Sequence, residues 1–82
     1  MGHKIPIERM LYMAASLNDE LAEPDLPEEK REFGSLLLAE MEAEFRTALD
    51  DVKALRAKLE PRTDPNSRAV FTYVEALLRS VA

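Results

Sequence analysis

The sequence predicts an all-α protein, and three observations support this fold class. Apolar residues recur at intervals of three and four along most of the chain, a spacing that places them on one face of a helix. The five prolines stand where helices begin or end. The sequence lacks the regular alternation of apolar and polar residues that is typical of strands. We therefore expect three helices, at about residues 6–22, 27–60 and 65–81, in a single helical domain spanning 1–82.

The first predicted helix begins at Pro6, because proline suits the first turn, where its missing N–H is not needed. Pro24 disfavours helical geometry in the residue before it, so the helix is expected to end near Ala22. Residues 1–5 are expected to form a loose N-terminus. The apolar positions of this helix are Ile7, Met10, Leu11, Ala14, Leu17 and Leu21.

The second predicted helix is long. Asp25 is expected to cap its start, with Glu28 bonding back in a capping box, and Gly34 is the single potential breaker before Pro61. About 33 residues at 1.5 Å each span roughly 50 Å. Its apolar positions alternate by three and four, as in a coiled coil. These positions are Leu38, Met41, Phe45, Ala48, Val52, Leu55 and Leu59.

The third predicted helix has the widest apolar surface. Asp64 and Pro65 form a suitable pair of N-cap and first helical residue. From Ala69 to Ala82, ten of fourteen residues are apolar. A helix that packs on one side only needs an apolar stripe little wider than about 100°. This helix is therefore expected to be buried on two sides, or else to be covered by a further part of a longer protein.

These lengths predict a homodimer. Both connections are short, so the outer helices should lie antiparallel to the long central helix, nearly end to end, and enclose no core. Residues 27–45 carry a net charge of −4 and residues 46–62 a net charge of +2, which favours antiparallel pairing of two copies. The residues expected at the interface are Leu38, Met41, Phe45, Val52, Leu55, Leu59, Val70, Phe71, Tyr73, Leu77 and Leu78.

Composition argues against several classes of protein. The net charge of −5 disfavours direct binding of nucleic acid, which needs a basic face. No run of 18 apolar residues occurs, so no membrane span is expected. The chain has no cysteine, which is consistent with a reducing compartment, and we expect a cytoplasmic protein.

The sequence predicts no catalytic, cofactor-binding or metal-binding residues. The single histidine, His3, lies in the expected loose terminus, and the two glycines, Gly2 and Gly34, cannot form a phosphate-binding loop. Paired carboxylates are the one plentiful reactive group. Glu29-x-x-Glu32 resembles the first metal-binding element of MazG-type all-helical nucleotide pyrophosphohydrolases. The second element of that family, Glu-x-x-Asp, does not occur in this sequence.

We therefore predict a small acidic interaction or regulatory module, without catalytic activity, that forms a homodimer and has a second protein as a further candidate partner. One alternative is an acidic inhibitor or antitoxin-like protein that blocks the basic site of a nucleic-acid-binding protein. Acidic residues clustered on one exposed face would favour it. A third hypothesis, a diverged carboxylate–metal nucleotide hydrolase, requires four convergent carboxylates. Phe45 is expected at the centre of the core, and Tyr12 on an exposed face.

Overall fold

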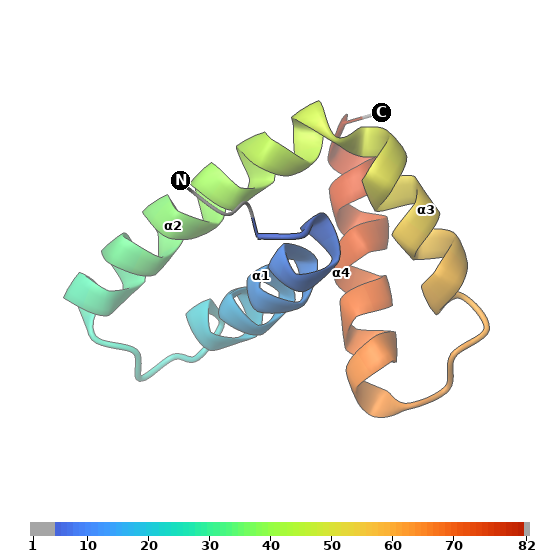
Figure 1. The fold of residues 1–82 in the computed structure, drawn as a ribbon. Helices are drawn as coiled ribbons and strands as arrows, with labels where there is room; N and C mark the ends of the chain where they lie inside the picture. Colours follow the sequence, from blue (N-terminus) through green and yellow to red (C-terminus); the bar gives the residue numbers. More distant parts are fainter. Residues whose placement is uncertain (1–4, 82) are drawn as a thin grey trace.

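The computed structural model describes residues 5–81, which form four helices. These are α1 (Ile7–Leu21), α2 (Glu28–Thr47), α3 (Leu49–Leu59) and α4 (Pro65–Val81). Figure 1 shows two helical hairpins, α1 with α2 and α3 with α4, joined at the end of α2. The all-α fold class is confirmed for this part of the chain. Residues 1–4 of the predicted loose N-terminus lie outside the described residues.

The prediction of one long helix over 27–60 was wrong, because the chain turns at Ala48. This residue has φ −123° and ψ 42°, outside helical geometry. Its N–H donates to the carbonyl of Phe45 (3.1 Å), which closes α2, and its own carbonyl accepts from the N–H of Val52 (3.1 Å), which opens α3. Figure 1 shows the change of direction at this point. The expected count of three helices is thereby corrected to four.

Local chemistry explains the position of this break. The hydroxyl of Thr47 donates to the carbonyl of Glu44 (2.8 Å), a side-chain bond that competes with helical bonding. Arg46 lies in the last turn of α2, and Asp50 and Asp51 lie in the first turn of α3. Each of these charges complements the adjacent end of a helix dipole. The segment therefore carries the electrostatic signature of one helix ending and another beginning.

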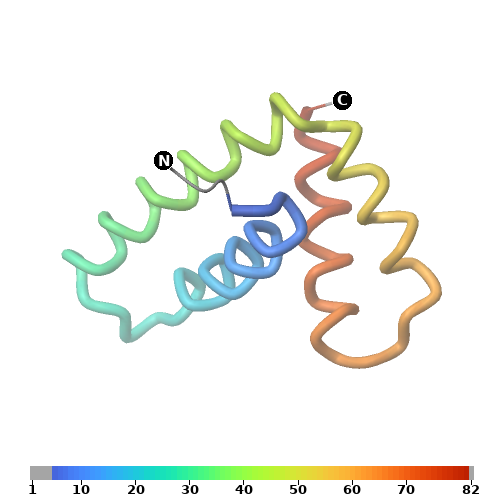
Figure 2. The backbone as a smooth tube through the Cα atoms, in the orientation of Figure 1, coloured from blue at the N-terminus to red at the C-terminus, as the bar shows by residue number. Residues whose placement is uncertain are grey.

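The break places α1 between α2 and the second hairpin. α1 contacts α2, α3 and α4, and the tube view shows it lying inside the angle that the other helices make (Figure 2). The expected end-to-end arrangement of the outer helices is therefore corrected, because α1 contacts α4 directly. A single chain thus covers much of the wide apolar surface of α4, which buries Val70, Phe71 and Val74 among others.

The core lies where the two hairpins meet. Leu11 of α1, Phe45 of α2, Val52 of α3 and Val74 of α4 are each completely buried, so every helix contributes to one cluster. The expected burial of Phe45 is confirmed. Tyr12, which we expected on an exposed face, is instead partly buried and packs against this cluster.

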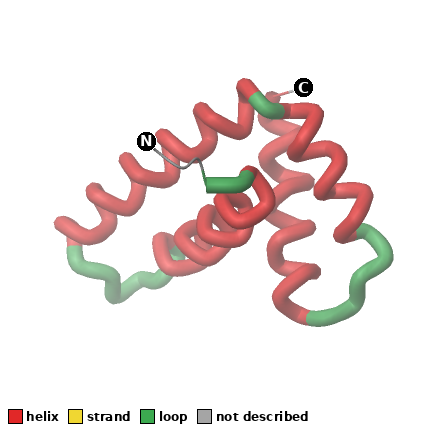
Figure 3. Tube along the Cα trace, viewed as in Figure 1, coloured by secondary structure: helices red, strands yellow, loops and turns green. Residues whose placement is uncertain are grey.

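The two loops within the hairpins, drawn green in Figure 3, differ in how the following helix starts. Asp64 caps α4 as predicted: its carboxylate accepts the N–H of Ser67 (3.0 Å), and this hydrogen bond lowers the pKa of Asp64. The predicted cap at Asp25 is not formed, because α2 begins after Pro27 and has no side-chain cap.

An arginine closes each hairpin loop in the same way. Arg31 is the fourth residue of α2 and donates to the carbonyls of Leu21 (2.8 Å) and Glu23 (3.0 Å), where α1 ends. Arg68 is the fourth residue of α4 and donates to the carbonyl of Glu60 (3.2 Å), just after α3. Carbonyls at the end of a helix lack partners within it. Both arginines supply such a partner from the next helix.

Candidate interaction surface

The residues predicted to form an intermolecular interface lie in or against the core of the single chain. Nine of them are buried there, and Leu38 and Leu78 are partly buried and pack against it. The structure brings these side chains together as intramolecular contacts. The nine buried residues are Met41, Phe45, Val52, Leu55, Leu59, Val70, Phe71, Tyr73 and Leu77.

Exposed apolar side chains gather instead on the first hairpin. Phe33 and Leu36 of α2 are each 69% exposed, and Met13 of α1 and Leu37 of α2 are also exposed. Within residues 5–81, all the exposed large hydrophobic side chains lie between Ile5 and Leu37. A contiguous apolar patch on a small protein marks a binding site more often than single exposed residues do.

Three neighbouring hollows join Met13, Phe33 and Leu37 into one groove, and Leu36 lies one turn along α2 from Phe33, outside their lining. Their volumes are about 400, 480 and 450 Å³, and all three are lined by Leu37. We call this continuous surface the α1/α2 groove. Its lining includes Met10, Tyr12, Met13, Ser16, Leu17, Glu20, Leu21, Leu26, Glu29, Lys30, Phe33, Gly34, Leu37, Glu40, Met41, Ala43, Glu44 and Asn66.

Gly34 allows the two helices that form the groove to approach closely. A Cβ at this position would lie 2.8 Å from Cδ2 of Leu21 and 3.4 Å from Cδ1 of Leu17. The helix passes through Gly34 without interruption, so the residue is no helix breaker here. Its missing side chain instead leaves room for leucines of α1 against the backbone of α2.

Acidic residues surround the groove. Residues 7–47 contain eleven Asp and Glu and four Lys and Arg, a net charge of −7, whereas residues 49–81 contain five and six, a net charge of +1. Glu20 and Glu29 line one end of the groove, and Glu40 and Glu44 line the other. Lys30 is the one basic residue in the lining. The groove therefore combines apolar walls with a negative edge.

Two arginines of the second hairpin, Arg56 and Arg68, make contacts within that hairpin. Nε of Arg56 on α3 donates to Oε2 of Glu75 on α4 (2.8 Å), and this hydrogen bond raises the pKa of Arg56. The guanidinium carbons of Arg56 and Arg68 lie 5.4 and 4.6 Å from the ring centre of Phe71. Both distances are within the range of cation–π attraction.

One polar contact joins the two hairpins. The hydroxyl of Tyr73 on α4 donates to Oε2 of Glu42 on α2 (2.8 Å). Burial raises the pKa of Tyr73 above its ordinary value, and the neighbouring Glu42 carboxylate raises it further. The phenol therefore stays protonated around neutral pH and acts as a hydrogen-bond donor.

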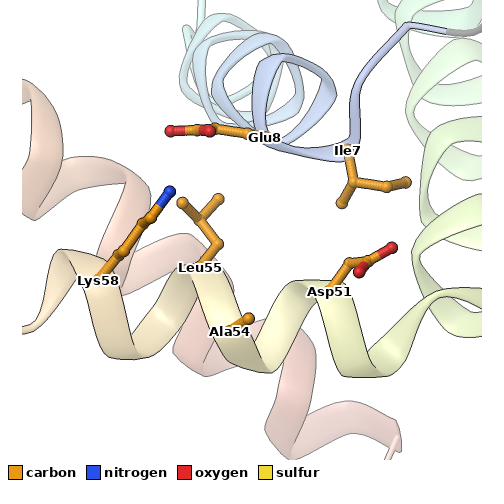
Figure 4. Close-up of a pocket in the computed structure, with 6 residues that line it drawn as sticks. All are labelled: Ile7, Glu8, Asp51, Ala54, Leu55 and Lys58. Atoms are coloured by element: carbon orange, nitrogen blue, oxygen red, sulfur yellow. The ribbon is translucent and has the colours of Figure 1, made fainter.

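A smaller pocket of about 250 Å³ lies between the start of α1 and α3 (Figure 4). Ile7 and Leu55 form its apolar side, and the Lys58 side chain extends from α3 towards α1, where Glu8 lies. Within residues 5–81, no three His, Cys, Asp or Glu side chains are close enough together to hold a metal ion. The paired acids Glu29 and Glu32 thus have no third ligand in this part of the chain.

Comparisons with protein-family models, with curated proteins and with solved structures gave no match to this chain. Across the four helices, none combines the length and the apolar character that crossing a membrane requires. A function for this protein is therefore inferred from the α1/α2 groove itself.

Phe33, which lines the groove, and the nearby Leu36 are the most exposed large apolar side chains of α2, and neither was predicted as a site residue. A signal was present, because Leu36, Leu37 and Leu38 are consecutive. Three adjacent leucines cover about 200° of a helix, which is more than one packing face requires. That run indicates a second apolar face beside the one that enters the core.

Proposed function

We propose that the protein is a small protein–protein interaction module, without catalytic activity, and that it docks a partner through the α1/α2 groove. The observation that carries this proposal is Phe33, which is 69% exposed and lines an apolar hollow, together with the equally exposed Leu36 about one turn further along α2. Complete burial of a phenylalanine or leucine side chain contributes about 1.5–3 kcal/mol. A partner that covered this patch would gain that contribution.

The chemistry of the groove supports a binding role. Its charged side chains, which are Glu20, Glu29, Lys30, Glu40 and Glu44, are all exposed to solvent. Groups that serve in catalysis commonly lie in clefts where burial and a charged partner change their pKa. Apolar walls with a charged edge are instead the composition of a docking surface.

The test compares proteins that bind the tagged chain in its host cells. The Phe33→Ser/Leu36→Ser double variant removes the exposed apolar side chains, and Lys53→Ser on α3 is a matched exposed control. We expect one partner to be recovered with the wild type and the control, and at least tenfold less with the double variant. Circular dichroism melts should agree for all three proteins. Equal recovery with the double variant would show that the groove is not the docking surface.

A second candidate function is the acidic inhibitor or antitoxin-like protein. The concentration of acidic residues in the first hairpin, with its net charge of −7, favours this role. Such a protein would occupy the basic site of its target, so it would displace nucleic acid from that target in a competition assay. A partner that binds the chain and nucleic acid at the same time would contradict it.

The homodimer stays a prediction. Sedimentation equilibrium at micromolar concentration distinguishes a dimer from the 9.3 kDa monomer. Since the buried residues named above already serve the single chain, a dimer in this fold would use the α1/α2 groove. A dimer that persisted in the Phe33→Ser/Leu36→Ser variant would place the contact elsewhere.

A further inference from the structure

We infer that the partner of the α1/α2 groove is a basic amphipathic helix of another protein. This inference rests on the proposed function, and it adds the conformation and the charge of the segment that binds. Two properties of the groove carry it: its position between two helices and its acidic edge.

The conformation follows from the groove's walls. α1 and α2 use their backbone N–H and C=O groups within the helices, so the walls offer no strand edge with which an extended peptide could pair. A helical segment satisfies its own backbone N–H and C=O groups, so it fits these walls better than an extended peptide does. Along α2 the groove runs from Glu29 to Glu44, roughly 22 Å at 1.5 Å per residue. A helix of about four turns, with apolar residues repeating at intervals of three and four, matches this length.

The charge follows from the residues at the two ends of the groove. Glu20 and Glu29 stand at one end and Glu40 and Glu44 at the other, with Lys30 as the only base in the lining. A helix whose apolar stripe is flanked by lysines or arginines would place positive charge beside both ends. The net charge of −7 on this hairpin would also attract such a segment from a distance.

A second copy of the chain does not offer a basic amphipathic helix to this groove. Within residues 5–81, no large hydrophobic side chain of α3 or α4 is exposed, so the hairpin that carries the net positive charge presents no apolar stripe. The exposed apolar side chains of a second copy lie on its own acidic hairpin. α2 alone has six acidic and three basic residues, so two grooves face to face would bring carboxylates together in either orientation.

The experiment titrates the full chain with three synthetic 14-residue peptides by calorimetry in 150 mM salt. One has leucines at helical spacing with lysines elsewhere. The second has the same leucines with glutamates, and the third keeps the lysines and has serine in place of each leucine. We expect the leucine–lysine peptide to bind at least tenfold more tightly than either of the others. Its affinity should fall as salt is raised, because the charges at the groove are exposed.

Variants locate the bound peptide. Phe33→Ser/Leu36→Ser should weaken binding of the leucine–lysine peptide at least tenfold. Glu40→Gln/Glu44→Gln should weaken it several-fold and reduce its dependence on salt. The control Asp50→Asn removes one exposed carboxylate from α3, outside the groove, and should change the affinity less than twofold. Backbone amide NMR shifts should change along α1 and α2 and stay constant in α3 and in the second half of α4.

The outcomes separate this inference from the proposed function. Equally tight binding of the leucine–glutamate peptide in the groove would overturn the basic partner and leave the docking surface in place. A dimer that Leu36→Glu converts to a monomer, with no peptide bound, would make a second copy the occupant, and again only the inference would fall. If neither peptide nor second copy used the groove, both proposals would be overturned.

Discussion

The two helical hairpins are closed in the same way but use their apolar surface differently. In each, an arginine four residues into the second helix binds carbonyls at the end of the first. The α3/α4 hairpin leaves no large hydrophobic side chain exposed within the described residues, and its arginines contact Glu75 and Phe71. The α1/α2 hairpin leaves Phe33 and Leu36 in solvent. The difference fits the proposed function, in which the second hairpin mainly stabilises the fold and the first would carry the docking surface.

The three phenylalanines provide the largest contrast. Phe45 is 0% exposed, Phe71 is 9% exposed and Phe33 is 69% exposed. Phe45→Ala should lower the free energy of unfolding by about 3–5 kcal/mol, because it leaves a cavity in the core. Phe33→Ala should change it by less than about 0.5 kcal/mol, because the ring is in water. Urea denaturation measures both. Similar losses for the two variants would contradict the separation of α2 into a face that enters the core and a face that is exposed to solvent.

The hydrogen bond between the two hairpins is expected to have the next largest effect on stability. Tyr73→Phe removes the hydrogen bond to Glu42 and should cost about 1 kcal/mol in unfolding experiments. The raised pKa of Tyr73 means that the folded chain keeps a proton that the unfolded chain loses above about pH 10. Stability of the wild type should therefore decline above that pH, and the decline should be smaller in Tyr73→Phe. An identical alkaline profile would show that the phenol does not link the hairpins.

The cap of α4 should produce a smaller, pH-dependent effect. Because its pKa is lowered by the Ser67 N–H, Asp64 stabilises the fold above its ordinary pKa of 3.8, and this contribution disappears as pH falls through the lower, folded value. Asp64→Ala should lower the melting temperature at pH 7. Its difference from the wild type should shrink below about pH 4. Asp25→Ala, in the loop before α2, should have little effect at either pH, since α2 has no side-chain cap.

Divalent metals should have no measurable effect. The acids of the first hairpin form no group of three potential ligands in the described part of the chain. Melting curves with excess Mg²⁺, Mn²⁺ or EDTA should therefore coincide. A rise of several degrees with one metal would contradict this and would support a site at Glu29 and Glu32, since a tightly bound ligand raises the melting temperature by mass action.

Sequence patterns predicted the helix ends that depend on local chemistry. Asp64 and Pro65 start α4 where the sequence placed that start, and the first helix ends at Leu21, one residue from the expected end. The turn at Ala48 was missed because apolar spacing continues through it, from Phe45 to Ala48 to Val52. A coiled-coil pattern and two helices that bend around a core share that spacing. Thr47, Asp50 and Asp51 were the residues that indicated a helix end and a new helix start at this point.

The binding surface was harder to predict, because an apolar residue in a sequence can belong to a core or to an interface. From the sequence, Val70 and Leu77 were expected to need a partner chain. In the structure both are buried within the single chain, where α4 packs against α1 and α3. Whether a side chain is covered depends on tertiary contacts, and here those contacts depend on a turn at one residue. Phe33 and Phe45 are the same residue type in the same helix, yet the fold buries Phe45 and exposes Phe33.

The short loops closed by Arg31 and Arg68 have a kinetic consequence. Each hairpin joins segments that are neighbours along the chain, and such low contact order is typical of domains that fold in microseconds to milliseconds. Each hairpin can form before the two dock, so the leucines of α2 spend little time in an unstructured, aggregation-prone chain. The main phase of stopped-flow refolding should be complete within milliseconds, apart from slower phases from isomerisation at the five prolines. A main phase that lasts seconds and is not accelerated by a prolyl isomerase would indicate that docking of the two hairpins, rather than hairpin closure, limits the rate.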